Sequence, residues 1–346
     1  MTTYTHISGI TPRRIVWVAV ALSALVLSLS LGAARALGTG ERSVSAGYQW
    51  PVKPFNRQHP VRGSFADPRT VFKASATLHG ALTGQGSFEL HRGIDIVAPD
   101  GSPVYPVASG TVTYVNAHWL KVDSGGGRVF EYWHIHAMVS TGAHVEAYRT
   151  VLGHILRGSG HVHLTELESD RAVNPLAPGH IGPYSDHTTP IVTSISFRGS
   201  ETGRDQLPNV IRGRVLLVAG AEDQPTMDAP EGWRGLPVTP ALITWQIRSW
   251  NGRVVLGRQV AADFRGNLPD RSFWQVYARG TYQNMAVFGH HYSWGQPGSY
   301  LFKLSPTPFD TRTIRDGAYD LVVTATDIRR NSSSLSRRFT SGKHRR

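Results

Sequence analysis

From about residue 48 to residue 184 the chain is a succession of short apolar runs broken by Gly, Pro, Asp and Ser, with almost no 3.6-residue periodicity. Short runs bounded by turn residues are typical of strands, and the missing helical period argues against a helical fold. Residues 120–123 and 128–136, joined by a Ser-Gly-Gly-Gly turn, predict a hairpin, and residues 104–115 predict two strands with a bend near Gly110. This pattern predicts an all-β domain over residues 48–184.

A second strand-rich region follows a stretch at 174–190 that is rich in Pro and Gly and typical of a linker. One face of residues 318–326 carries Tyr319, Leu321, Val323 and Ala325 at period two. Strands separated by turn signals predict a β-sandwich of immunoglobulin or fibronectin type over residues 185–341. The aromatic-rich stretch 263–298 is either a large loop or strands that the pattern does not position. The candidate strands are 191–197, 212–219, 242–248, 299–304, 318–326 and 335–340.

The N-terminal segment predicts export. Residues 1–14 carry Arg13 and Arg14 but no acid, and residues 15–31 form an uncharged apolar run. Small residues at Ala34 and Ala36 then occupy the positions that a signal peptidase inspects. We expect a hydrophobic helix within residues 1–36 that acts as a signal peptide. An uncleaved membrane anchor is the alternative, because about 17 apolar residues is the lower limit for spanning a bilayer. Both place the rest of the chain in the cell envelope or outside the cell.

The cysteine count restricts the chemistry. With no cysteine, the chain has no disulfides, no thiolate metal site and no cysteine nucleophile. A metal site must therefore use histidine and carboxylate, and eleven of the 16 histidines fall between His79 and His187. His161 and His163 are two residues apart, so in a strand both imidazoles point to one face.

His91 and Asp95 form a second candidate pair. In a straight strand they would lie about 13 Å apart, too far for one ion. If they share a metal, the chain must bend between them, and Gly93 is the residue that permits a bend. Two histidines and one aspartate with an open fourth position have the composition of a catalytic zinc site.

The order of these residues resembles the M23 peptidases, the zinc endopeptidases of lysostaphin and LytM type that cut peptidoglycan cross-bridges. The resemblance covers roughly residues 60–170. It implies that His91, Asp95 and His163 bind zinc (Zn2+), that His134 and His161 hold and polarise the attacking water, and that an antiparallel sheet carries the zinc groove on one face. The matching segments are His91-Arg92-Gly93-Ile94-Asp95, residues 101–112, Tyr132-x-His134, Gly142-x-x-Val145, Leu152-Gly153 and His161-x-His163.

Three features depart from the family pattern. The segment 154–160, before the His-x-His pair, is shorter than the family's usual loop, which shortens one wall of the substrate groove. Thr165 stands where the family has a Glu two residues after the last histidine, and Glu166 follows on the opposite face of a regular strand. His136, two residues after His134, is a rival for that catalytic position.

The sequence therefore predicts an exported zinc metalloendopeptidase that hydrolyses peptide bonds in peptidoglycan cross-links or stem peptides through a zinc-activated water. The alternative is a non-catalytic LytM-like module that binds cell wall or regulates another hydrolase. The chain retains all three residues that the resemblance implies as zinc ligands, which disfavours this alternative. The shortened segment 154–160 is the feature that favours it. A third reading, an adhesin whose sandwich carries the function around a purely structural zinc, is disfavoured by the open coordination position.

The distribution of net charge suggests binding partners other than the peptide substrate. Most of the formal charge of +12 lies at the two ends of the chain, because residues 1–36 hold three arginines and residues 329–346 hold seven Arg or Lys, with no acid in either segment. The C-terminal end, including the basic tail 342–346, suits anionic wall polymers or a membrane surface. A solvated tail is the alternative. We expect no nucleic-acid partner.

Overall fold

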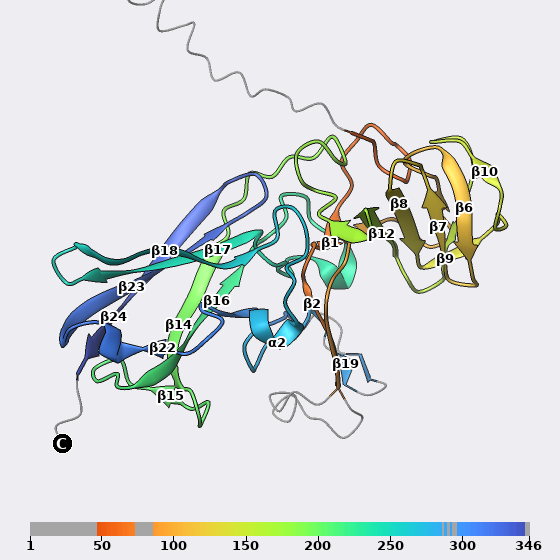
Figure 1. Ribbon diagram of the computed structural model, residues 1–346. Coiled ribbons are helices and arrows are strands. Elements are labelled where there is room, and N and C mark those ends of the chain that lie inside the picture. Colours follow the sequence, from red (N-terminus) through yellow and green to blue (C-terminus); the bar gives the residue numbers. More distant parts are fainter. Residues whose placement is uncertain (1–46, 73–85, 286, 289–290, 293–295, 343–346) are drawn as a thin grey trace, which may run out of the picture. The chain divides into compact units, whose positions relative to one another are not determined.

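A computed structural model describes residues 47–72, 86–285, 287–288, 291–292 and 296–342 (Figure 1). The predicted N-terminal helix of residues 1–36 and residues 343–346 of the basic tail lie outside the described residues. No helix in the described ranges is long and apolar enough to cross a bilayer.

The prediction of an all-β chain is confirmed: the described residues form five sheets and only very short helices. The largest sheet has eight strands in the order β1-β4-β12-β8-β7-β6-β10, with β13 paired to β12. The predicted hairpin is the β7–β8 pair, whose turn places three successive glycines at positive φ. The strands of this sheet are β1 (Val61–Gly63), β4 (Ile94–Val97), β12 (His161–Glu168), β8 (Arg128–Trp133), β7 (Trp119–Asp123), β6 (Gly110–Val115), β10 (His144–Val145) and β13 (Arg171–Val173).

Period-two alternation divides the central strands of this sheet into two faces. Val162 and Leu164 of β12 point into the hydrophobic core and are fully buried, as are Ile94 and Ile96 of β4. The odd-numbered residues of both strands point to the other face. The predicted site residues of these strands, Asp95, His161 and His163, are odd-numbered, so burial of the core face fixes the register that brings the three side chains to one surface.

Two smaller sheets flank the large one. A three-stranded sheet has the order β5-β11-β9, and a four-stranded sheet has the order β20-β19-β2-β3. In the second of these, β19 pairs parallel to β2, so a segment from the far end of the chain completes a sheet begun near residue 68. The strands are β5 (Pro103–Val104), β11 (Gly153–Ile155), β9 (Ile135–Ala137), β20 (His291–Tyr292), β19 (Val287–Phe288), β2 (Pro68–Phe72) and β3 (Gly86–Leu90).

The predicted β-sandwich is present. One sheet has the order β15-β14-β16-β21, with β22 also paired to β16, and the other has the order β18-β17-β23-β24. All six candidate strands form, and Tyr319, Leu321, Val323 and Ala325 are buried along one face of β23. The strands are β14 (Ile191–Gly199), β15 (Asp205–Gln206), β16 (Arg214–Glu222), β17 (Leu242–Ser249), β18 (Val254–Asp263), β21 (Leu301–Lys303), β22 (Phe309–Asp310), β23 (Gly317–Thr326) and β24 (Ser332–Ser341).

The unassigned stretch 263–298 contains the short helix α2 (Phe273–Val276) as well as β19 and β20. Two 3-10 turns, η2 (Glu231–Trp233) and η3 (Thr311–Thr313), lie elsewhere in this half of the chain. The predicted linker near residue 174 is buried: Asn174 is 4% exposed, and its side-chain amide donates to the Phe264 carbonyl. Residues before and after 185 therefore share hydrogen bonds as well as a chain connection.

Three aspartates, Asp186, Asp223 and Asp327, are buried together, and each offers an oxygen within 4.8 Å of the others. Burial, followed by the charges of Asp186 and Asp327, raises the pKa of Asp223 to about 8. In the unfolded chain this carboxyl ionises near its ordinary pKa of 3.8. Between these values the folded state retains a proton that the unfolded state has lost, so the free energy of unfolding falls as pH rises.

Replacing Asp223 by Asn is therefore expected to flatten the loss of stability between pH 4 and 8, by up to about 1.4 kcal/mol per pH unit. The measurement is urea unfolding at several pH values, with a chelator present so that metal binding does not contribute. Asp228→Asn, in the same loop but exposed, is the matched control and should retain the wild-type slope. An unchanged slope in Asp223→Asn would contradict the assignment.

Candidate metal centre

Cross-strand pairing and one bend bring the first three site residues together. His163 of β12 lies directly opposite Asp95 of β4 on one side and Trp133 of β8 on the other. Directly opposed residues have Cβ atoms about 4.5–5.5 Å apart, which is within reach of a shared ion. His91 follows β3, and its backbone N–H donates to the Asp67 carbonyl over 2.9 Å.

The chain bends between His91 and Asp95 at Gly93, as the sequence predicts. The need for glycine comes from a close approach, since Gly93 is not among the residues at positive φ. A Cβ at this position would lie 2.1 Å from the carbonyl oxygen of Leu164 in β12. The bend and the pairing of β4 with β12 therefore both depend on a residue without a side chain.

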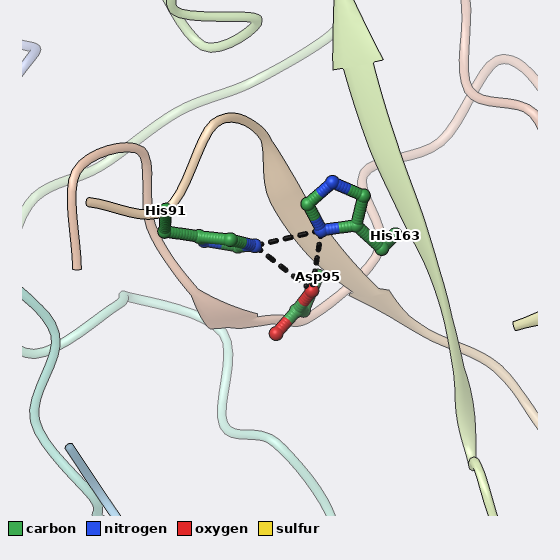
Figure 2. Close-up of side chains that lie close together, drawn as sticks. All are labelled: His91, Asp95 and His163. Carbon is green, nitrogen blue, oxygen red and sulfur yellow. Dashed lines mark hydrogen bonds and ion pairs between the residues drawn. The ribbon is translucent and has the colours of Figure 1, made fainter. Parts of the chain in front are cut away.

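Three ligand-type atoms converge on one point (Figure 2). His91 Nε2 is 2.7 Å from His163 Nδ1 and 3.2 Å from Asp95 Oδ1, and His163 Nδ1 is 3.1 Å from the same oxygen. Two imidazole nitrogens and one carboxylate oxygen are a donor set that suits zinc, whose ligands lie at about 2.0–2.2 Å. The residues present thus fit the ion that the sequence predicts.

The outward-facing atom of each ligand is also bonded. His91 Nδ1 is 2.8 Å from the Ser64 carbonyl oxygen, and His163 Nε2 is 2.7 Å from Thr165 Oγ1. Asp95 Oδ2 accepts from Arg69 Nη2 over 2.7 Å. Such partners fix ring tautomer and carboxylate orientation around a metal. Thr165 therefore bonds the ring from the position at which the family pattern has Glu.

Electrostatics keep these groups in the forms that bind cations. Burial lowers the pKa of His91 to about 3, and the charge of Arg69 adds to the effect. Burial alone would raise the pKa of Asp95, but Arg69 and the neighbouring histidines outweigh it and hold that pKa well below its ordinary value. At neutral pH His91 is therefore neutral and Asp95 ionised, as metal ligands must be.

His134 and His161 lie beside this trio. Their rings are 4.5 Å apart between centroids, and His161 Nε2 is 3.6 Å from Asp95 Oδ1. His161 Nδ1 is 2.5 Å from the Ser159 carbonyl and its Nε2 is 3.1 Å from Arg62 Nη2, so Nε2 is the acceptor in the neutral ring. Burial lowers the pKa of His161 to about 3.

His136, the alternative to His134 as a catalytic residue, lies outside the site. His134 has φ of 64°, a left-handed conformation that ends β8 and turns its ring toward His161. His136 lies in β9, paired with His154 of β11, and is not among the residues that line the cleft around the trio. Of the two candidates, His134 is the one placed beside the metal-type ligands.

All five predicted site residues line one open cleft of about 690 Å³. Its walls include residues from the second half of the chain, namely Trp233, Gln283 and Asn284. The Arg62 guanidinium lies 3.9 Å from the centroid of the Trp233 ring. Gln283 Oε1 accepts from the Thr70 N–H over 2.6 Å, which secures that wall to β2.

The shortened segment 154–160 forms part of the same cleft through Gly158 and Ser159. Asp100 holds it by accepting from the backbone N–H groups of Gly158 and Gly160 over 2.6 and 2.8 Å. The short segment is thus a turn that two hydrogen bonds to Asp100 hold, and it lines the cleft. Sequence reasoning did not single out Arg62, Arg69, Ser64 or Trp233, because nothing in their local pattern points to residues so distant along the chain.

Comparison with known proteins finds a family match for the segment that holds the site. Residues 89–175 match the model of peptidase family M23. No curated protein matches the chain. Similar solved structures include a zinc-containing peptidase from Vibrio cholerae, with 25% identity over 37% of this chain and 38% of that one at a TM-score of 0.29. They also include the SpoIIQ–SpoIIIAH pore-forming complex, with 22% identity over 37% and 88% at 0.28. The deep-sea M23 metalloprotease pseudoalterin has 14% identity over 46% and 93% at 0.26.

The match begins just before His91 and ends beyond His163, so it contains the whole metal-type trio and both neighbouring histidines. The antiparallel pairing of β4 with β12 presents Asp95, His161 and His163 as the sequence resemblance implies. The segment of this chain from residue 89 to residue 175 is therefore a member of peptidase family M23.

Proposed function

We propose that the protein is an exported zinc metalloendopeptidase that hydrolyses peptide bonds in peptidoglycan cross-links or stem peptides. The observation that carries the proposal is the arrangement of His91, Asp95 and His163, each with one atom directed to a common point and the other held by a neighbour. A salt-bridge cluster formed only for stability would not need this division between inner and outer atoms. Zinc held by the trio would supply a Lewis acid and lower the pKa of a coordinated water toward 7.

His161 and His134 are suited to the proton transfers of peptide hydrolysis. The Ser159 carbonyl accepts from His161 Nδ1–H, so Nε2 carries the lone pair; this lone pair accepts from Arg62 and exchanges that hydrogen bond for a proton when the ring acts as a base. The adjacent His134 ring remains partly exposed at the cleft mouth, and desolvation lowers its pKa to about 4. Both rings are then neutral at pH 7, and each can take a proton at one nitrogen and return it to a leaving amine.

The chain composition supports the proposed substrate and compartment. The N-terminal apolar segment supports export, and family M23 supports a peptide substrate in the cell envelope. As part of this proposal, residues 48–184 form the peptidase domain and residues 185–341 form a sandwich domain that also shapes the cleft. The basic C-terminal end would hold the enzyme near anionic wall polymers or a membrane surface.

Incubation of the mature protein with purified sacculi tests the proposal. The wild-type protein should release new amino termini, a chelator should stop the release, and added zinc should restore it. Sacculi with glycine bridges and sacculi with direct D-Ala cross-links would identify the bond. A protein that holds one zinc yet releases no amino termini from either kind of sacculus would contradict the enzyme reading, and binding without cleavage would support the non-catalytic alternative.

Arg69 gives a sharper test of the ligand arrangement. Because Arg69 holds the outer oxygen of Asp95, Arg69→Gln is expected to weaken zinc binding about tenfold to a hundredfold, the range typical of outer-shell partners. Loss of a positive charge works in the opposite direction, by favouring a cation. Arg92→Gln removes the same charge from an exposed residue in the same cleft and so measures that effect alone.

The measurement for both variants is competition for zinc with a chromophoric chelator. Weaker binding in Arg69→Gln than in Arg92→Gln is the expected result. Equal affinities in the two variants would show that Arg69 acts only through its charge.

A further inference from the structure

A second cavity lies on the outer face of one sandwich sheet, away from the metal-type trio. It has a volume of about 540 Å³, within the usual range for small-molecule sites. Leu216 and Val218 of β16 and Trp274 of α2 form its apolar lining; Figure 1 labels these two elements. No proposed step of peptide hydrolysis uses this cavity.

Three cations line the cavity: Arg198 from β14, Lys303 from β21 and Arg279 from the loop after α2. One acid, the exposed Glu201, lies at its rim. Within the described residues, neither Lys303 nor Arg279 has a carboxylate within ion-pair distance, whereas Arg198 is paired with Asp205 over 3.2 Å. The charges of Lys303 and Arg279, which have no such carboxylate partner, repel one another and Arg198, and a bound anion lowers that cost.

Hydrogen bonds hold two of these cations, Arg198 and Lys303, in place before any ligand arrives. Arg198 Nη1 donates to the Arg279 carbonyl oxygen over 2.8 Å, which ties the β14–β15 hairpin to the loop after α2. Lys303 Nζ donates to the Trp274 carbonyl oxygen, and two ammonium N–H groups remain for other acceptors. A preorganised cavity avoids part of the ordering cost of binding.

From this arrangement we infer that the cavity binds a phosphate ester, with the phosphate among Arg198, Arg279 and Lys303 and the organic part over Leu216, Val218 and Trp274. Three donors from different elements suit an anion with three or more oxygens better than a carboxylate, which a single Arg satisfies. The cavity is larger than a phosphate ion, so an ester should bind more tightly than inorganic phosphate. The inference is independent of peptidase activity.

Titration of the zinc-loaded protein with glycerol 3-phosphate, followed by 31P NMR at low ionic strength, tests the inference. We expect saturable binding at one site, tighter than that of inorganic phosphate and weakened by added salt. Lys303→Gln and Arg279→Gln should each weaken binding at least tenfold. Arg279 is exposed, so its variant keeps the test valid even if the half-buried Lys303 proves necessary for folding.

Two controls separate this site from other causes. Arg258→Gln, on an exposed position of β18, removes the same charge from the other sheet and should leave binding unchanged. His163→Ala should also leave it unchanged, because its altered side chain lies in the metal centre. Loss of binding in His163→Ala, equal weakening by Arg258→Gln, or no saturable binding to the wild type would each overturn the inference.

The natural source of the ester can be separated in the same experiment. Soluble poly(glycerol phosphate) and vesicles of phosphatidylglycerol carry the same phosphate chemistry. Binding to the first alone assigns a polymer, and binding to the second alone assigns a lipid headgroup. Binding to neither would overturn the inference that the cavity binds a phosphate ester of the cell envelope.

Discussion

Replacing His163 by alanine is expected to remove the metal and, with it, measurable hydrolysis of sacculi. His163 Nδ1 faces both His91 Nε2 and Asp95 Oδ1, so its loss leaves two ligands and an open site. The expected fall in zinc affinity exceeds a hundredfold, the upper range for changes outside the ligand set. Zinc per protein, measured by elemental analysis after dialysis, and release of amino termini are the two readouts.

The neighbouring histidine should separate binding from turnover. His161→Ala is expected to keep zinc but to lower turnover by about a hundredfold to ten-thousandfold, because its Nε2 is placed to move a proton rather than to bind the ion. His144→Ala, on an exposed position of β10, is the control for removal of a histidine and should match wild type in both readouts. Equal zinc loss in His161→Ala and His163→Ala would show that the two roles are wrongly assigned.

Gly93→Ala is expected to have the largest effect on stability, a loss of about 3 kcal/mol or more. The added Cβ would lie 2.1 Å from the Leu164 carbonyl oxygen and 3.0 Å from Thr165 Oγ1, so β4 must move away from β12. That movement would also separate Asp95 from His163, and zinc affinity should fall with stability. Urea unfolding and the zinc competition measure the two effects.

Gly257→Ala is the matched control, because a Cβ at Gly257 in β18 meets no atom within 4 Å. Its free energy of unfolding should stay within about 0.5 kcal/mol of wild type. If Gly93→Ala unfolds at the wild-type urea concentration and keeps wild-type zinc affinity, the backbone must accommodate the side chain, and the close approach does not fix the site.

Local patterns predicted much of the fold because a strand with one buried face carries its own signal. Period two in residues 318–326 predicted which side chains of β23 are buried, and the glycine turn at 125–127 predicted the β7–β8 hairpin. Very short strands, such as those in the segment 263–298, were harder to predict because they show no periodicity. Within the segment 263–298, strand β19 pairs with β2, which lies about two hundred residues earlier in the chain. No local periodicity in the sequence encodes such a pairing.

For the candidate site too, some features could be predicted from the sequence and others could not. The sequence alone predicted the candidate site residues, because the absence of cysteine left histidine and carboxylate as metal ligands, and the order of His91, Asp95, His134, His161 and His163 resembles one family. It also located the bend at Gly93. These features are encoded in residue type and spacing, which a sequence displays directly.

Only the tertiary structure decided what surrounds that set. The placement of Arg69 on the outer oxygen of Asp95, the contact of Trp233 with Arg62 and the exclusion of His136 from the cleft arise from strand pairing and side-chain direction. The same holds for the three cations of the sandwich cavity, which come from β14, β21 and the loop after α2. Such contacts join residues far apart in the chain, and their partners become neighbours only when burial of the core fixes the register of the sheets.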